Sequence, residues 1–321
     1  MDTQAILIEK PKNLRIARLP LHDVTAGDVV VRIDKSSIST GTERLLWRGE
    51  MPWFPGLEYP LVPGYEALGT VCETTPGAGH ALGARVFVPG ANCYQGARGL
   101  FGAAASRVVT PGARVFEVAP ALGDDALLLA LAATAQHALA PAVLGDKTLI
   151  IGNGVVGRLL ARLMLAAGHP APTVWEREPA RRTADAVPQS EGVPAYNVIA
   201  PQDDDERAYT TIFDASGDAT ILDHVVPHLA RGGEIVLTGF YATPLSLTFP
   251  PAFMREARIR IAAEWQPDDM AHVLAALANG TFSLAGIITH RAAIDDAAAA
   301  YETAFSDPRC TKMILEWSST P

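Results

Sequence analysis

Cysteine is scarce in this 321-residue chain, and the three that occur form no metal-binding or disulfide pattern. Cys72, Cys93 and Cys310 include no CxxC pair, and their odd number leaves one cysteine over. This excludes a small disulfide-stapled domain and argues against a zinc site built from four cysteines. Because 49% of the residues are hydrophobic, we expect the chain to fold around its own cores, with reduced thiols in the cytoplasm.

Long hydrophobic runs and excess positive charge are also missing. The one long apolar stretch, residues 126–144, contains polar residues and a proline, and Asp124 and Asp125 precede it as helix-start residues, so a buried helix is expected. Residues 1–11 lack a basic segment leading into an apolar run, so no signal peptide is expected. The net charge of −9 disfavours nucleic acid and anionic lipid as general partners.

The spacing of short apolar runs divides the chain into two kinds of sequence. Runs such as 29–33 and 84–88, bounded by turn formers, predict a β-rich domain over residues 1–118. Strand-like runs then alternate with helical stretches over 119–256, which predicts a doubly wound α/β domain with a parallel sheet. Residues 257–321 are expected to complete the first domain. The expected second-domain elements are strands at 148–151, 173–176, 211–215 and 234–238 and helices at 155–167 and 219–229.

A glycine-rich segment with the spacing GxGxxG lies between the first of these strands and its helix. Its glycines permit a tight turn, close approach of a pyrophosphate and close packing of helix on strand, while the helix N-terminus faces the phosphates. Glu176 ends the next strand, where a carboxylate would bind adenosine ribose hydroxyls and repel a 2′-phosphate. These features predict NAD as the cofactor. The residues of the turn are Gly152, Asn153, Gly154, Val155, Val156 and Gly157.

Other residues near the expected cofactor leave alternatives open. Arg177, Arg181 and Arg182 can pair with a 2′-phosphate and so favour NADP. Asp214 ends a strand and is either structural or adjacent to the adenosine. Ser216 follows a strand and is expected at the cofactor. Gly239, Phe240 and Tyr241 end another strand and are expected near the nicotinamide, unless they form a plain turn.

Three segments together resemble the medium-chain dehydrogenase/reductase superfamily over almost the whole chain: Pro63-Gly64-Tyr65-Glu66-Ala67-Leu68-Gly69, the GxGxxG turn, and Gly286-Ile287-Ile288-Thr289-His290. The resemblance implies a GroES-like barrel as catalytic domain, a Rossmann domain for the cofactor, and a homodimer joined through the cofactor domains. Zinc alcohol dehydrogenases of that superfamily have metal ligands where this chain has Ser39, Tyr65 and Ala130. Serine and tyrosine are poor zinc ligands and alanine is none, so no metal is expected.

Without a metal, another group must handle the proton of an alcohol substrate. The candidates near the expected reaction centre are Ser39, Thr42, Glu43, Tyr65 and Glu66. Tyr65 can act as a general base beside a cationic nicotinamide, or it can simply fill the space of a missing metal. Glu66 is either catalytic or a buried structural carboxylate. Two lone histidines in apolar surroundings are expected to be satisfied core residues: His137 and His290.

Four longer blocks closely resemble the bacteriochlorophyllide a dehydrogenases of photosynthetic bacteria. They cover residues 39–43, 89–94, 131–137 and 249–265 and span both expected domains. The resemblance implies oxidation of the 3-(1-hydroxyethyl) group of a pigment precursor to 3-acetyl, with a tetrapyrrole as substrate. The alternatives are a zinc-free reductase that uses NADPH to reduce quinones or activated alkenes, and a non-catalytic NAD-binding protein.

An aromatic segment near the N-terminus is compatible with such a substrate. Its side chains can cover the face of a large planar ligand, or they can pack a loop against the core. The candidate substrate residues are Trp47, Trp53, Phe54 and Tyr59.

Overall fold

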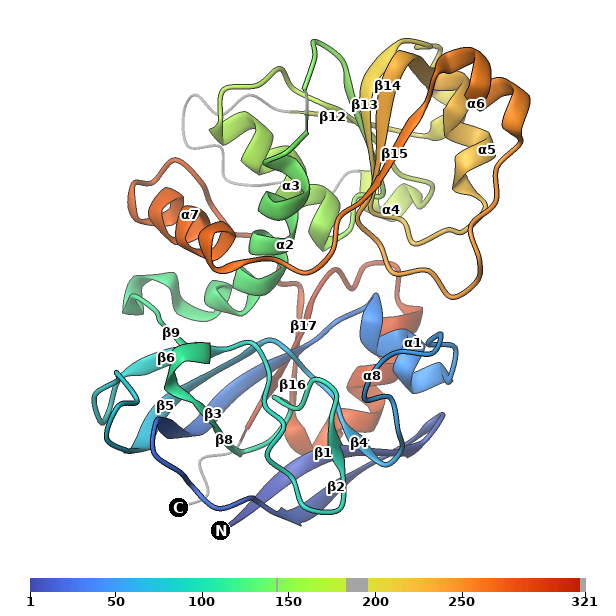
Figure 1. The fold of residues 1–321 in the computed structure, drawn as a ribbon. Coiled ribbons are helices and arrows are strands. Elements are labelled where there is room, and N and C mark those ends of the chain that lie inside the picture. Colours follow the sequence, from blue (N-terminus) through green and yellow to red (C-terminus); the bar gives the residue numbers. More distant parts are fainter. Residues whose placement is uncertain (143, 183–195, 318–321) are drawn as a thin grey trace. The chain divides into compact units, whose positions relative to one another are not determined.

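The computed structural model describes residues 1–142, 144–182 and 196–317, which form two compact units (Figure 1). Unit 1 comprises Met1–Ala130 and Ile287–Pro321, and unit 2 comprises Leu131–Gly286. The first boundary between the units thus follows Ala130, whereas the sequence predicts it after residue 118. The second precedes Ile287, whereas the sequence predicts it before residue 257. The second boundary is late because β15 (Arg258–Ile261) pairs in parallel with the preceding strand and so belongs to the sheet of unit 2.

Unit 1 is rich in β-structure, as expected. One sheet has the order β2-β1-β4-β7, and the other has the order β16-β17-β3-β5-β6-β9, with β8 also paired to β3. Strand β3 is long because a run of buried valines at its start packs into the core while polar residues alternate further along. Two helices accompany these sheets, α1 (Thr42–Arg48) and α8 (Ala297–Ser306). The strands are β1 (Asp2–Lys10), β2 (Asn13–Pro20), β3 (Asp28–Ile38), β4 (Leu61–Val62), β5 (Ala67–Thr74), β6 (Arg85–Val88), β7 (Arg98–Gly99), β8 (Arg107–Pro111), β9 (Phe116–Glu117), β16 (His290–Ala293) and β17 (Met313–Glu316).

Unit 2 contains a parallel sheet with the order β12-β11-β10-β13-β14-β15. In chain order this is third, second, first, fourth, fifth and sixth, the doubly wound order that binds dinucleotides where the strand order reverses. The four strands expected from the sequence are confirmed. The strands are β10 (Thr148–Ile151), β11 (Thr173–Trp175), β12 (Asn197–Ile199), β13 (Tyr209–Asp214) and β14 (Leu229–Leu237).

Helices cover the two faces of this sheet. In Figure 1, α3 lies on one side of the sheet, and α5 and α6 lie on the other. Both expected helices are confirmed, although the second is shorter than predicted and continues as a 3-10 turn over Val226–His228. The helices are α2 (Leu129–Leu139), α3 (Val155–Ala166), α4 (Pro179–Arg182), α5 (Ile221–Val225), α6 (Phe249–Arg255) and α7 (Pro267–Ala278).

The apolar stretch expected as one helix over 126–144 is divided. A 3-10 helix covers Pro120–Leu128, and only α2 is α-helical. Asp124 therefore does not cap a helix; its carboxylate binds Lys35 at 2.8 Å and Arg291 at 2.5 Å. In the described ranges, no helix has the length and apolar character needed to cross a membrane.

Candidate active site

The glycine-rich turn of unit 2 has the geometry that a dinucleotide needs. It follows β10, and Gly152 adopts a φ of +94°, a region that favours glycine. A Cβ on Gly157 would lie 1.8 Å from the Gly152 carbonyl oxygen, so helix α3 approaches the turn too closely for any other residue. A Cβ on Gly154 would meet no described neighbour within 4 Å, so space is open beside the turn. The N-terminus of α3 at Val155 adds backbone N–H groups that favour an anion.

Glu176 lies directly after β11 and is almost fully buried. Its Oε2 accepts the backbone N–H of Asn153 at 2.9 Å, and its Oε1 accepts that of Glu178 at 2.8 Å. The carboxylate therefore holds the glycine-rich turn in place, a function that the motif spacing does not reveal. Each carboxylate oxygen retains further lone-pair capacity for a ribose hydroxyl.

The arginines that follow Glu176 differ in their surroundings. Arg177 is exposed, and its guanidinium lies 3.4 Å from the carboxylate of Asp218. Arg182 instead donates from Nε to the carbonyl oxygen of Glu176 at 2.8 Å. The carbonyl of Arg181 accepts the side-chain amide of Asn153 at 2.9 Å. Arg182 and the backbone of Arg181 thus hold Glu176 and Asn153, whereas the charge of Arg177 lies at the surface.

Asp214 organises the ends of β13 and β14 rather than facing outward. It is fully buried, and its Oδ1 accepts the N–H and hydroxyl of Ser216 at 2.9 and 2.6 Å. Its Oδ2 accepts the hydroxyl of Tyr241 at 2.6 Å. Burial raises the pKa of Asp214, although the Ser216 and Tyr241 hydrogen bonds oppose the increase. These contacts favour the structural reading of Asp214 and fix the turns that contain Gly239 and Phe240.

Unit 1 brings three of the candidate catalytic residues together. The Oγ of Ser39, just after β3, lies 2.6 Å from the hydroxyl oxygen of Tyr65. The side chain of Thr42, at the start of α1, lies near enough to the phenol to favour its ionised form slightly. Burial, with a smaller contribution from Glu66, raises the pKa of Tyr65 well above its usual value. The phenol is therefore neutral at physiological pH and is held by the hydroxyl of Ser39.

The fourth candidate, Glu66, belongs to a buried ion pair. Its Oε2 lies 2.5 Å from Nζ of Lys312 and accepts the hydroxyl of Ser37 at 2.5 Å. Its Oε1 is buried and has no hydrogen-bond partner among the described residues. Lys312 also contacts the Ile38 carbonyl at 3.4 Å. Sequence reasoning missed Lys312, because it lies 246 positions from its partner and no local pattern marks it.

A second buried acid and the fifth candidate, Glu43, lies beside these residues. It occupies the first turn of α1, where Oε1 accepts the N–H of Ser39 at 3.2 Å. Its Oε2 accepts the hydroxyl of Tyr301, from α8, at 2.6 Å. Burial raises the pKa of Glu43 from 4.5 to about 7.

Ser39, Tyr65 and Ala130 stand where the resemblance to zinc dehydrogenases leads us to expect metal ligands. Ser39 and Tyr65 hydrogen-bond each other, and Ala130 provides no donor side chain. Among the described residues, no three His, Cys, Asp or Glu side chains gather closely enough to hold a metal ion. The residues that are present do not fit a catalytic zinc.

The aromatic segment divides into packed and open side chains. Trp47 packs against Phe305 with ring centroids 5.6 Å apart, and the hydroxyl of Tyr59 donates to the Leu46 carbonyl at 2.5 Å. Trp53, by contrast, is 86% exposed. Trp47 and Tyr59 therefore make contacts within unit 1, whereas Trp53 offers an open indole surface.

Phe54 connects the segment to the hydroxyl pair through a residue that sequence reasoning missed. Its ring lies 6.2 Å from that of Phe101, and Phe101 lies 5.4 Å from the ring of Tyr65. Both contacts are edge-on. Phe101 thus places aromatic surface between Phe54 and Tyr65, although it lies more than thirty residues from either in the sequence.

The two histidines have partners within their own units. His137 Nδ1 lies 2.9 Å from a carboxylate oxygen of Asp269, in unit 2. His290 Nδ1 lies 2.9 Å from the hydroxyl of Thr289, in unit 1. These contacts agree with the expectation that both are satisfied residues and not ligands.

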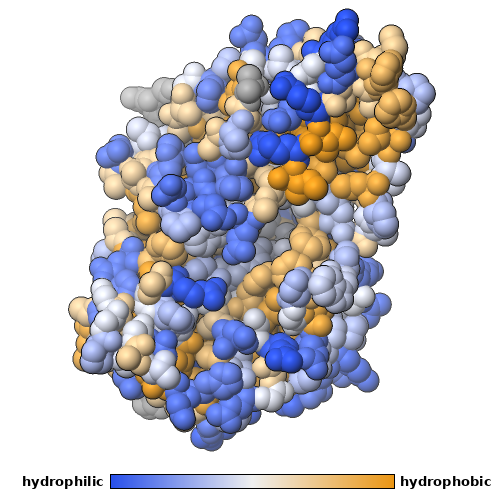
Figure 2. Space-filling view, in the orientation of Figure 1, coloured by the Kyte–Doolittle hydropathy of each residue, from blue (hydrophilic) through white to orange (hydrophobic). Residues whose placement is uncertain are grey.

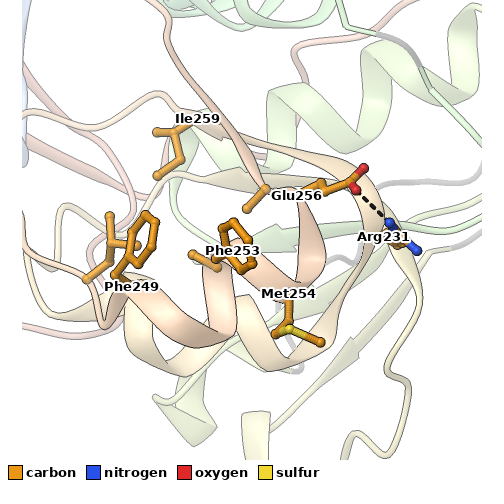
Figure 3. A pocket seen from close by; sticks show the side chains of 9 residues that line it. Arg231, Phe249, Phe253, Met254, Glu256 and Ile259 are labelled. Carbon is orange, nitrogen blue, oxygen red and sulfur yellow. Dashed lines mark hydrogen bonds and ion pairs between the residues drawn. The ribbon is translucent and has the colours of Figure 1, made fainter.

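One apolar patch remains open on unit 2. Figure 2 shows hydrophobic side chains gathered over α6, at the upper right, and Figure 3 shows Phe249, Phe253 and Ile259 lining a shallow pocket there. An ion pair between Arg231 and Glu256, at 2.6 Å, lies at its border. The most exposed apolar residues of this region are Phe249, Phe253, Met254, Ile259 and Ile261.

Comparison with known proteins agrees with this architecture. Residues 25–120 match the alcohol dehydrogenase GroES-like domain. Among solved structures, an Escherichia coli CFT073 alcohol dehydrogenase complexed with NADH is similar, with a TM-score of 0.81, 21% identity and coverage of 98% of this chain and 99% of that one. An E. coli oxidoreductase of unknown specificity has a TM-score of 0.83 at 18% identity, with 99% and 100% coverage. Both likenesses support the predicted fold.

Two curated relatives are much more similar in sequence. A 2-desacetyl-2-hydroxyethyl bacteriochlorophyllide A dehydrogenase of Cereibacter sphaeroides is 52% identical over 100% of both chains. Its namesake in Rhodobacter capsulatus is 51% identical over 99% of both chains. The chain therefore belongs to the bacteriochlorophyllide a dehydrogenases, within the medium-chain dehydrogenase family of oxidoreductases.

Proposed function

We propose that the chain oxidises the 3-(1-hydroxyethyl) group of a (bacterio)chlorophyllide a to a 3-acetyl group, in the cytoplasm, as a step of bacteriochlorophyll biosynthesis. The names of its two half-identical relatives support this substrate class. The observation that carries the chemistry is the Ser39–Tyr65 hydroxyl pair, whose oxygens lie 2.6 Å apart. The resemblance to zinc dehydrogenases places two of their metal ligands at about these positions. Two such hydroxyls can hold and pass a proton.

The proposed cofactor is NAD, which supplies the acceptor for the hydride when it is bound. Gly152 and Gly157 let the turn approach a pyrophosphate, and the N-terminus of α3 stabilises its charge. Glu176 favours NAD over NADP, because a 2′-phosphate beside this buried carboxylate would be repelled. The residues present therefore fit a dinucleotide without the extra phosphate.

We further propose that the reaction is independent of zinc. Tyr65 orients the substrate hydroxyl through a hydrogen bond, and Ser39 holds Tyr65. The substrate reduces the need for a Lewis acid, because its conjugated ring system delocalises the positive charge that develops at the carbinol carbon. Elemental analysis of the purified chain tests this directly: one zinc per chain, with loss of activity on chelation, would refute it.

The aromatic segment would bind the face of the macrocycle. Trp53 provides exposed surface, and Phe54 and Phe101 continue aromatic surface up to Tyr65. Burial of a large planar ligand against such rings supplies the binding free energy that positions the carbinol carbon. Small alcohols lack this contact area, and we expect them to be very poor substrates.

The decisive experiment is anaerobic incubation of the purified chain with a 3-(1-hydroxyethyl) pigment and NAD. We expect NADH to form together with the spectral shift that accompanies conjugation of a new acetyl group to the ring. Ethanol serves as the matched alcohol without a macrocycle. Ready turnover of ethanol, or of a quinone with NADPH, while the pigment stays unchanged would overturn the substrate assignment and favour another zinc-free oxidoreductase. No turnover of any alcohol or quinone would favour a non-catalytic NAD-binding protein.

We also propose that the chain forms a homodimer through unit 2. Strand β15 pairs only with β14 in the described sheet, so one of its edges is open. An open edge with exposed apolar residues such as Ile259 and Phe253 beside it is an association surface. A second copy fits it best, because a two-fold axis places an edge strand antiparallel to itself and brings the two apolar patches together.

The dimer is tested by the mass of the chain in solution. We expect the parent to sediment at about twice 34.0 kDa, and the double variant Phe253→Asp/Ile259→Asp to sediment as a monomer. Leu82→Asp is the matched control, since Leu82 is about as exposed as Phe253 but lies in unit 1. A monomeric parent, or a double variant that remains dimeric, would refute this interface.

A further inference from the structure

The interior of unit 1 holds more acid than base around Ser39. Glu43, Glu66 and Lys312 are each at most 1% exposed, so two carboxyl groups share one ammonium in a region closed to water. An ionised carboxylate without a cation is costly in such a region, and the group then takes up a proton more readily than in water.

The hydrogen bonds identify which carboxyl group this is. Glu66 takes the ammonium of Lys312, at 2.5 Å. Among the residues that the structure describes, the donors to Glu43 are uncharged: the N–H of Ser39 at 3.2 Å and the hydroxyl of Tyr301 at 2.6 Å. Uncharged donors stabilise a buried carboxylate less than an ammonium does. Glu43 is therefore the group of this cluster that gains and loses a proton most easily near neutral pH.

The groups around Glu43 account for the direction of its pKa. Burial is the largest influence and raises the pKa to about 7, and the charge of Glu66 adds to the increase. The hydrogen bonds from Tyr301 and Ser39 and the charge of Lys312 oppose it. Tyr65 adds no charge, because its own pKa is raised and its phenol stays neutral.

Ser39 links this acid to the proposed reaction centre. Its N–H binds Glu43, and its Oγ lies 2.6 Å from the hydroxyl of Tyr65. Glu43 also acts on Tyr65 directly, because its charge adds to the increase in the pKa of the phenol. Any change in the charge of Glu43 is thus felt at both hydroxyls of the pair.

We propose that Glu43 is a positioning residue that acts through Ser39, and that its ionised form enables the Ser39–Tyr65 pair to accept the proton of the alcohol. This rests on the proposed function. The substrate O–H bond breaks as Tyr65 gains that proton, Tyr65 passes its own proton to Ser39, and Ser39 passes its own to the Glu43 carboxylate. For the last transfer, the Ser39 hydroxyl turns toward the carboxylate that its N–H already contacts. The hydride leaves separately with the bound dinucleotide, so atoms and charge balance.

The first test needs no substrate. Infrared spectra of the intact chain, recorded across about pH 6–8, should show a carboxylic acid band that disappears as the pH rises through about 7. Glu43→Gln should remove the band. Tyr301→Phe keeps the carboxyl group but deletes a hydrogen bond that lowers its pKa, so the band should persist to higher pH. A band that does not titrate in this range, or that survives in Glu43→Gln, would overturn the proposal.

The second test is the pH dependence of initial rates of pigment oxidation. Below the pKa of Glu43 we expect kcat to rise about tenfold per pH unit and then to level off. Tyr301→Phe should shift this midpoint upward, and Glu43→Gln should abolish the inflection while NAD affinity stays unchanged. If Glu43 were only structural, Glu43→Gln would lower the stability of the fold, and Tyr301→Phe would leave the pH midpoint of kcat where it is in the parent. An unshifted midpoint in Tyr301→Phe would therefore refute the positioning role. A titrating infrared band in a chain that leaves the pigment untouched would support the ionisation of Glu43 and refute the proposed function instead.

Discussion

The hydroxyl oxygens of Ser39 and Tyr65 lie 2.6 Å apart, a short hydrogen bond between residues 26 positions apart in the chain. Ser39 follows β3 and Tyr65 precedes β5, and the antiparallel pairing of these strands brings them together. Each is a poor metal ligand alone, but together they form a hydroxyl pair that can donate to and accept from a third oxygen. This arrangement makes the role of Tyr65 directly testable.

Tyr65→Phe deletes the phenolic hydroxyl and keeps the ring against Phe101. If the pair handles the proton, kcat for pigment oxidation should fall by roughly 10²–10⁴-fold, the usual contribution of a positioned acid or base, while KM changes little. Steady-state kinetics with pigment and NAD measure both constants. Tyr94→Phe is the matched control, because Tyr94 is also a buried tyrosine and its hydroxyl donates to the Gly102 carbonyl, away from the Ser39–Tyr65 pair. A kcat near that of the parent would show that Tyr65 merely fills space.

Glu176→Ala tests the cofactor preference. The parent should prefer NAD. Removal of the carboxylate should narrow the difference in kcat/KM between NAD and NADP by roughly 1.5–3 kcal/mol, the range for hydrogen bonds to charged groups. Because Glu176 also accepts the N–H groups of Asn153 and Glu178, the variant should bind both cofactors less tightly. Glu176→Gln separates the two effects, since it keeps an acceptor oxygen for the turn without the charge. A parent that prefers NADP in kcat/KM would contradict the assignment.

The cofactor turn was predictable because its residues are local. Gly152 and Gly157 lie in one strand–turn–helix segment, and their spacing alone encodes the close approach seen in the structure. The second role of Glu176, as acceptor for the turn, depends on the return of the chain through β11 and has no sequence signature. Local geometry was therefore accessible from the sequence, whereas contacts made across the sheet were not.

The parts that escaped prediction depend on distant contacts. The sequence Arg258–Ile261 alternates like a strand of either domain, and only its pairing with β14 places it in unit 2. Asp124 has the composition of a helix cap, but Lys35 and Arg291 bind it from strands far away in the chain. Burial acts to raise the pKa of Asp124, but the hydrogen bonds from these two residues outweigh it and lower the pKa below its usual value.

The buried Glu66–Lys312 pair predicts an asymmetric effect on stability. Lys312→Met leaves the Glu66 carboxylate buried without its cation, and we expect a loss of about 3–5 kcal/mol. The double variant Glu66→Leu/Lys312→Met should recover much of this loss, because replacement of both charges by apolar groups is often neutral. Lys35→Met is the matched control, since that lysine is partly exposed and surface pairs contribute about 0–1 kcal/mol. Thermal unfolding measures the stability of all three variants. Equal shifts of the melting temperature for Lys312→Met and Lys35→Met would contradict the argument.

The open surface of Trp53 predicts a binding defect without a folding defect. Because the side chain is 86% exposed, Trp53→Ala should leave the melting temperature nearly unchanged. If the indole covers the macrocycle, KM for the pigment should rise by about tenfold, equivalent to about 1.4 kcal/mol, while the Kd of NAD stays the same because the glycine-rich turn lies in unit 2. Leu82→Ala is the matched control in unit 1, with a similarly exposed apolar side chain.

Phe101→Leu provides the complementary test, at the inner end of the aromatic surface. The substitution keeps an apolar side chain but removes the edge-on contacts to Phe54 and Tyr65, each worth about 0.5–1.5 kcal/mol. Without the contact from Phe101, the phenol that orients the substrate hydroxyl is held less firmly. We therefore expect kcat to fall and KM to rise. Trp53→Ala, by contrast, should change KM alone. The split between the two constants distinguishes a residue that only binds the macrocycle from one that also positions Tyr65. If Phe101→Leu changes neither constant, the pigment does not bind along this surface, and the ring of Phe101 serves only the packing of unit 1.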